Sequence, residues 1–192
     1  MKKIILVMGM FLTFAALAPF ANATEITFDA FSSGATYTED EFTLTADDGS
    51  EFYAITEDDA LYGYYYTGSV ALVNDYTTTT TLVATDGSLF DLTSIDLAEA
   101  FTEDLLYEAT ISFIATYADN STYSFNLTTD GIEGIETFTF GSQMTNLASV
   151  SFGENESFQF DNIAAHTVPE PSTILMLVVG MCAWAGARRK LA

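Results

Sequence analysis

The feature that most constrains the fold of this chain is a repeated alternation of apolar and polar residues, in short segments, between Thr24 and Thr167. "EATISFIATY" (108–117) and "STYSFNLT" (121–128) show it most clearly. Side chains of a strand point alternately to the two faces of its sheet, so this period of two, rich in β-branched and aromatic residues, predicts half-buried strands. "ADNS" (118–121) supplies turn residues between the two segments and predicts a β-hairpin.

The pattern recurs in about eleven segments, and no amphipathic helix is expected. Proline is absent between Thr24 and Val168, so turns rest on stretches such as "DDGS" (47–50), "TDGS" (85–88) and "TDGIEG" (129–134). Many short strands with such turns predict an all-β fold, an antiparallel jelly-roll-like β-sandwich over residues 24–167. The phenylalanines expected in its core are Phe113, Phe125, Phe138, Phe140, Phe152, Phe158 and Phe160.

Charge divides the chain sharply. All five Lys and Arg lie at the two ends, and with 26 acidic and no basic residues the segment from Thr24 to Val168 carries a formal charge of −26. Such a body repels nucleic acid and anionic lipid and attracts cations. The acidic groups at 39–41, at 47–51 and at 57–59 do not have the spacing of an EF-hand, and we expect them in solvated loops.

Cysteine and histidine are nearly absent. Cys182 is the only cysteine, so the body has no disulfide and no thiolate metal site. His166 is the only histidine, and we expect it in the linker before the C-terminal tail. A catalytic body without Lys, Arg or an internal His is unusual, so the sequence favours a protein that is not an enzyme. A carbohydrate-active hydrolase with a carboxylate pair is the less favoured alternative.

The N-terminus has the three parts of a secretory signal peptide. Lys2 and Lys3 precede an apolar stretch from Ile4 to Leu17, and Ala21-Asn22-Ala23 fits a small-x-small cleavage site. We therefore predict a signal peptide over residues 1–23, removed by signal peptidase after Ala23.

The C-terminal residues 168–192 combine Val168-Pro169-Glu170-Pro171, an uncharged stretch of 14 residues (174–187), and Arg188-Arg189-Lys190. Basic residues stay on the cytoplasmic side of a membrane, so this order predicts a short membrane helix that holds an exported body by its C-terminus. An ordinary C-terminal anchor is the alternative.

In this order, and with a signal peptide, the tail resembles the PEP-CTERM sorting signal of exported bacterial proteins. The resemblance implies processing by an exosortase in a Gram-negative host that makes exopolysaccharide. It also implies transient anchoring in the inner membrane and a final place at the cell surface or in the extracellular matrix. It covers only the tail and implies no activity of the body.

The segment "SFQFDNI" (157–163) resembles the closing strand of exported jelly-roll domains, including carbohydrate-binding modules. In several such modules the matching Asp binds a structural Ca²⁺, which implies Asp161 as a ligand here. Asp29 is the expected second ligand, because the first and last strands of a sandwich often lie close. The alternative is that Asp161 accepts hydrogen bonds from backbone amides at a strand end.

Four tyrosines gather around a glycine in "LYGYYYTG" (61–68), and they are the candidate ligand-binding residues: Tyr62, Tyr64, Tyr65 and Tyr66. Their rings suit stacking on sugars, and they also suit a half-buried strand with a wet edge. The threonine run at 77–81 is too short by itself to predict a threonine-lined ice face, which needs a flat array over many strands.

Together these features predict an exported, non-catalytic protein of the cell surface or matrix that binds or organises exopolysaccharide. The alternative is a structural or adhesive protein without a sugar site. Calcium is the candidate cofactor, and nucleic acid is not expected as a partner.

Overall fold

The structure is a computed structural model, and it describes residues 23–47, 49–74, 78–102, 108–153, 157–168 and Gly180. The predicted signal peptide up to Asn22 and almost all of the predicted sorting signal lie outside these residues. Among the described residues, no helix is long and apolar enough to cross a membrane.

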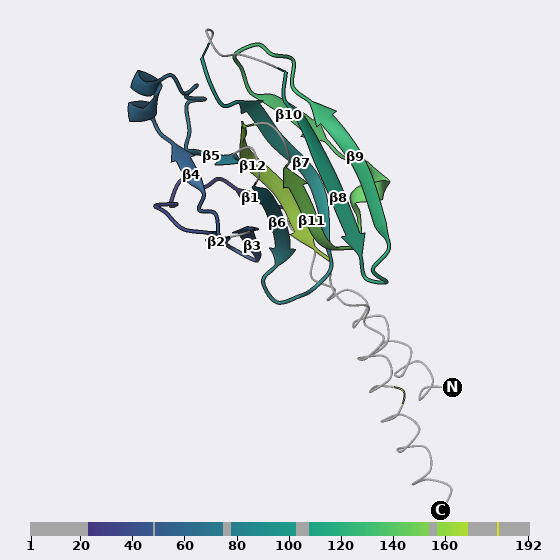
Figure 1. The fold of residues 1–192 in the computed structure, drawn as a ribbon. Coiled ribbons are helices and arrows are strands. Elements are labelled where there is room, and N and C mark those ends of the chain that lie inside the picture. Colours follow the sequence, from purple (N-terminus) through teal and green to yellow (C-terminus); the bar gives the residue numbers. More distant parts are fainter. Residues whose placement is uncertain are drawn as a thin grey trace, which may run out of the picture.

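Among the described residues, twelve strands, all paired antiparallel, build the fold (Figure 1). The first six are β1 (Thr24–Ile26), β2 (Thr36–Glu39), β3 (Phe42–Ala46), β4 (Tyr53–Ile55), β5 (Ala71–Asn74) and β6 (Thr79–Ala84). The others are β7 (Phe90–Glu99), β8 (Thr110–Tyr117), β9 (Thr122–Thr128), β10 (Glu136–Thr139), β11 (Leu147–Gly153) and β12 (Phe158–Thr167). Two short 3-10 helices of the described part of the chain, η2 (Glu57–Tyr62) and η4 (Ser142–Met144), lie in the connections.

The pairings define two sheets joined at one point. The first sheet has the order β10-β7-β12-β5-β4, with β1 beside the second half of β12, and the second has the order β9-β8-β11-β6-β3-β2. The pair between Phe90 in β7 and Leu147 in β11 joins them, so the whole is one curled sheet folded on itself. The predicted all-β, jelly-roll-like sandwich and the β8–β9 hairpin are confirmed.

Phenylalanine fills the space between the sheets. Phe152 of the second sheet meets Phe160 of the first edge to face, with ring centroids 5.1 Å apart, and Phe28 meets Phe160 in the same way at 5.5 Å. Each such ring contributes about 2–3 kcal/mol through burial. Of the predicted core residues, four are fully buried (Phe113, Phe152, Phe158 and Phe160), while three are half-buried and pack against the core (Phe125, Phe138 and Phe140).

Carboxylates take over structural tasks in a body that has no Lys or Arg. Glu39 accepts hydrogen bonds from the backbone N–H groups of Thr27 and Phe28 and from the Tyr37 hydroxyl, at 2.9–3.3 Å. These bonds hold Phe28 at φ 59°, a conformation that bulky residues rarely adopt, with its ring in the core. The expectation that this acidic group lies in a solvated loop is therefore wrong for Glu39.

Two further expectations are corrected in the same way. Asp47 accepts a hydrogen bond from the backbone N–H of Thr79 at 2.7 Å, and it is half-buried rather than solvated. His166 is not in a linker: it lies in β12, opposite Asp91 of β7, with 3.3 Å between Nε2 and a carboxylate oxygen. The last strand continues to Thr167, two residues beyond the segment "SFQFDNIAA" (157–165) that the sequence predicts as a strand.

Candidate functional site

Exposed and half-buried aromatic side chains gather where η2 and the segment after it meet the ends of β4 and β7. We call Tyr53, Leu61, Tyr62, Tyr64 and Phe101 the tyrosine surface. Leu61 and Tyr62 are the most exposed large apolar side chains of the described residues, at 84% and 79%, and Tyr53 is 45% exposed. Figure 1 shows η2 projecting from the edge of the fold, beyond β4.

The local sequence fixes η2 in this position. Thr56 precedes the helix, and its N–H and hydroxyl both donate to Asp59, at 2.8 and 2.7 Å. Such a capping box satisfies donors that a helix start leaves free. Gly63 ends the helix in the left-handed conformation at φ 88°, where a side chain would be strained. Leu61 and Tyr62, in the last turn, therefore point away from the body.

Three of the rings stack in a column. The ring centroids of Tyr53 and Tyr64 lie 5.3 Å apart, and those of Tyr64 and Phe101 lie 5.2 Å apart, with interplanar angles of 34° and 30°. The Tyr53 hydroxyl donates to Asp59, and this bond raises the pKa of Tyr53 to about 12 and lowers the pKa of Asp59. The same carboxylate thus caps η2 and orients the outer ring of the column.

The predicted tyrosines separate into two pairs. Tyr62 and the half-buried Tyr64 belong to the tyrosine surface, while Tyr65 and Tyr66, which are also half-buried, lie outside it in the segment between η2 and β5. The backbone of Tyr65 is fixed there, because its N–H donates to the Ala100 carbonyl and its carbonyl accepts from Gln159. Sequence analysis missed Tyr53 and Phe101, which are far apart in the sequence and become neighbours only through the β4–β5 and β7–β12–β5 pairings.

Asp161 lies on the outer face of the first sheet and is 3% exposed. Its carboxylate accepts hydrogen bonds from the Ser69 hydroxyl at 2.5 Å and from the backbone N–H of Asn162 at 2.8 Å. Burial raises the pKa of Asp161 to about 6; the two hydrogen bonds lower it, and the nearby carboxylates of Asp96 and Asp29 raise it further. Both carboxylate oxygens thus have donors within the protein.

The expected closeness of the first and last strands is confirmed, because β1 pairs with β12 from Thr24 to Ile26. Asp29 follows three residues later, is exposed, and lies near enough to Asp161 to affect its pKa. Among the described residues, however, these two aspartates do not belong to a group of three metal-ligating side chains. A Ca²⁺ ion bound by Asp161 and Asp29 stays a prediction.

A different set of carboxylates does come together. Glu99, Asp130 and Glu136 offer oxygen atoms that all lie within 4.8 Å of one another. The sequence does not reveal this group, because its three residues do not form an acidic run but are separated by 31 and 6 positions. The one available signal was their placement, since each lies at the end of an alternating segment or in the turn beside it.

Hydroxyl groups cover the outer face of the second sheet. A row runs across four strands through Thr36, Thr45, Thr81 and Ser151, which are partners in successive strand pairs. The Thr81 and Ser151 hydroxyls lie 2.9 Å apart. Along β2, β3, β6 and β11 the outward positions carry no charged side chain: Thr36, Thr38, Thr43, Thr45, Thr79, Thr81, Val83, Ser149 and Ser151.

The C-terminal end of the body leads directly into the tail. β12 ends at Thr167, and the N–H of Val168 donates to the Leu89 carbonyl at 2.7 Å. Residues 167–190 match the PEP-CTERM protein-sorting motif. The chain carries a PEP-CTERM sorting signal. It is a secreted protein with a C-terminal sorting signal, and the motif implies export through the exosortase pathway.

The residues that make up the predicted sorting signal lie almost entirely outside the described part of the chain. Of the seven residues predicted to make up the sorting motif, Val168 is described, and Pro169, Glu170, Pro171, Arg188, Arg189 and Lys190 are not. At the other end, Ala23 is described and Ala21 is not. Cleavage after Ala23 therefore stays a prediction.

No curated protein matches the chain in sequence. In structure the chain is similar to a family 29 carbohydrate-binding module, at 11% identity and a TM-score of 0.45 over 78% of this chain and 90% of that one. A variant of such a module is 10% identical, with a TM-score of 0.43 over 77% of this chain and 92% of that one. The family 11 module from Clostridium thermocellum, in complex with a β-1,3-1,4-mixed-linked tetrasaccharide, is 11% identical. Its TM-score is 0.33 over 78% of this chain and 97% of that one. At these values the likeness carries no argument about what the PEP-CTERM protein binds.

Proposed function

We propose that this PEP-CTERM protein is a non-catalytic protein of the cell surface or extracellular matrix that binds neutral exopolysaccharide through its tyrosine surface. The observation that carries the proposal is the exposure of Leu61 and Tyr62 beside the Tyr53–Tyr64–Phe101 column. Two large apolar side chains that are about four-fifths exposed serve no packing role in the described fold, and exposed apolar groups that adjoin one another mark interaction sites.

The chemistry of the surface suits a sugar. Aromatic faces pack against the C–H groups of a pyranose ring, while phenol hydroxyls and carboxylates bond to its hydroxyl groups. The acidic residues at 57–59 adjoin the rings, and the whole body carries a formal charge of −26. A neutral glycan is favoured over an anionic one because it is not repelled by that field.

A second candidate function rests on the hydroxyl-covered face of the second sheet. A surface without charged side chains, in a body this acidic, can lie against another neutral polar surface without repulsion. On this alternative the protein is adhesive and needs no sugar site. The row from Thr36 to Ser151 would then be the contact surface rather than Tyr62.

One binding experiment separates the two functions. We would measure retention of the purified full-length protein, in non-ionic detergent, on the insoluble polysaccharide of an exosortase-bearing host, for the wild type and for Tyr62→Ala and Thr45→Glu. Glycan binding by the tyrosine surface predicts that Tyr62→Ala weakens retention about tenfold, as for a central aromatic contact, and that Thr45→Glu does not. Loss with Thr45→Glu alone would support adhesion, and retention unaffected by Tyr62→Ala would refute the glycan proposal.

The proposed route rests on the sorting motif at 167–190. The basic end would keep the tail in the inner membrane until an exosortase cleaves near Pro169-Glu170-Pro171 and releases the body. Changing these three residues to alanine should leave unprocessed protein in the inner-membrane fraction of the host. The same amount of released protein from the variant and the wild type would contradict this route.

A further inference from the structure

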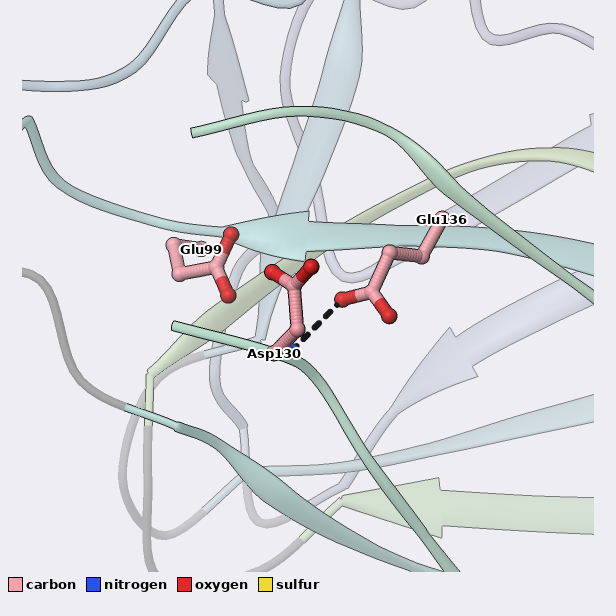
Figure 2. A group of neighbouring side chains, drawn as sticks. All are labelled: Glu99, Asp130 and Glu136. Carbon is pink, nitrogen blue, oxygen red and sulfur yellow. Dashed lines mark hydrogen bonds between the residues drawn. The ribbon is translucent and has the colours of Figure 1, made fainter. Parts of the chain in front are cut away.

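Glu99, Asp130 and Glu136 converge from two paired strands of the first sheet and from the loop that leads into one of them. Glu99 is the last residue of β7, Glu136 is the first residue of β10, which pairs with β7, and Asp130 lies in the β9–β10 loop. Figure 2 shows the side chain of Asp130 between those of Glu99 and Glu136. This arrangement places three carboxylates around one point, with ligand oxygens within 4.8 Å of one another.

The loop fixes the orientation of each carboxylate through its own backbone. The N–H of Gly131 donates to Glu99, the N–H of Asp130 donates to Glu136, and the N–H of Ile132 donates to Asp130, each at 2.9 Å. These bonds engage one oxygen of each side chain. They hold the group in place without neutralising its charge.

The second oxygen of Glu99 is the observation that points to a ligand. Glu99 is 2% exposed, and its Oε2 atom is buried without any hydrogen-bond partner. Among the described residues it is the only buried carboxylate oxygen left in this state. A buried oxygen that carries negative charge and has no donor is costly unless something else binds it.

The body offers no cation of its own to do so. It contains no Lys and no Arg, and its single His166 already faces Asp91 at 3.3 Å. Three carboxylates whose oxygens lie within 4.8 Å of one another repel each other when they are ionised. The missing countercharge must therefore come from solution.

We propose that Glu99, Asp130 and Glu136 bind one Ca²⁺ ion. The ligands are all oxygen atoms, with no His or Cys at the group, which suits a hard cation rather than zinc. Two oxygens bound to one Ca²⁺ at about 2.4 Å can be at most about 4.8 Å apart, and the observed separations lie within that limit. Water completes the coordination on the side of the exposed Asp130.

The ion would tie the β9–β10 loop to the end of β7. Glu99 lies two residues before Phe101, whose ring stacks on Tyr64. The site therefore adjoins the tyrosine surface without including any of its residues. The proposal does not depend on glycan binding, and the two are tested by different measurements.

The test is calorimetric titration of Ca²⁺ into the full-length protein in non-ionic detergent, at a constant ionic strength of about 0.15 M, together with thermal melting followed by circular dichroism. The variants are Glu99→Gln, which keeps the bond to Gly131 but removes the charge, and Asp130→Asn. Glu25→Gln, which removes an exposed carboxylate of β1, is the matched control.

For the wild type and Glu25→Gln we expect one saturable site with a dissociation constant of about 0.1–1 mM, as in extracellular calcium modules, and a rise in Tm of about 5 °C at 10 mM Ca²⁺. Glu99→Gln should abolish both signals, and Asp130→Asn should weaken binding at least about tenfold. Should Glu99→Gln fail to fold, Asp130→Asn decides, because Asp130 is exposed.

Three results would overturn the proposal. They are an isotherm without a saturable site, an equal rise in Tm for Glu99→Gln and Glu25→Gln, and an equal rise with Mg²⁺ in every variant. The last two would mean that cations only screen the charge of the body. Loss of polysaccharide retention in Tyr62→Ala with calcium binding unchanged would separate the two proposals.

Discussion

Asp161 and Glu99 are both buried carboxylates of the first sheet, at 3% and 2% exposure, but their surroundings differ. The oxygens of Asp161 both accept hydrogen bonds, from Ser69 and from Asn162. Glu99 has one oxygen bonded to Gly131 and one without a partner. The protein itself thus supplies a hydrogen-bond donor to each oxygen of Asp161, whereas the second oxygen of Glu99 gains a partner only when a ligand binds.

The difference shows how a body without Lys or Arg can bury negative charge. Backbone amides and hydroxyl groups replace the missing cations at Asp161, as they do at Glu39 and Asp59. Such donors stabilise a carboxylate locally, but they carry no net charge. Where three carboxylates meet, as at Glu99, donors of this kind are insufficient, and a cation is needed.

The largest effect that tests the comparison is on the pH dependence of stability. The pKa of Asp161 is raised to about 6 from its usual 3.8, so the folded protein binds a proton there more tightly than the unfolded chain. The protonated Asp161 therefore stabilises the fold fully at pH values below the pKa of the unfolded chain, 3.8. This stabilisation is lost as the pH rises through the pKa of the folded protein, about 6, and amounts to about 3 kcal/mol in total. Without calcium, the free energy of unfolding of the wild type should fall by about 2 kcal/mol relative to Asp161→Asn between about pH 4 and 6.5, which is most of the total.

Urea unfolding of both proteins across this range, in EDTA, gives the measurement. Asp161→Asn is a suitable reference because its amide oxygen can still accept the bond from Asn162. Parallel curves for the two proteins would break the comparison, since they would mean that Asp161 titrates alike in the folded and unfolded states.

A smaller effect sharpens the comparison. Ser69→Ala removes one donor from Asp161, which should raise the carboxyl pKa above about 6 and lower the free energy of unfolding by about 1 kcal/mol at pH 8. NMR titration of the Asp161 carboxyl carbon and urea unfolding measure the two quantities. Ser149→Ala, on the other sheet, should change neither, and an unchanged pKa in Ser69→Ala would show that this hydroxyl does not stabilise the charge.

The fold was predictable from the sequence because its signal is local. Alternation sets which side chains of a strand face the core, and turn residues mark where a hairpin reverses, so β8, β9 and their turn follow from "ADNS" and its neighbours. Phe125 and Phe138 are less buried than expected because β9 and β10 lie at the edges of the two sheets. Position within a sheet does not follow from the alternation of one strand.

The sites were less predictable because they depend on contacts between distant residues. Tyr62 was found from its run of tyrosines, whereas Phe101 joins the surface only through the pairing of strands. Glu99 looks like any other acid in a chain with 26 of them in its body, and only burial beside Asp130 distinguishes it. Acidic runs were a misleading guide for the same reason, since Glu39 serves as an acceptor for backbone amides.

The position of β12 has a consequence for when the protein can fold. This strand pairs with β1, β5 and β7, and it carries Phe158 and Phe160 into the core, yet it is the part of the body closest to the sorting tail. A chain exported from its N-terminus delivers this central strand last, so the sandwich cannot close until nearly the whole body has crossed the membrane. The tail would thus hold the chain at the membrane while β12, the last strand of the body, inserts between β5 and β7, which were exported before it.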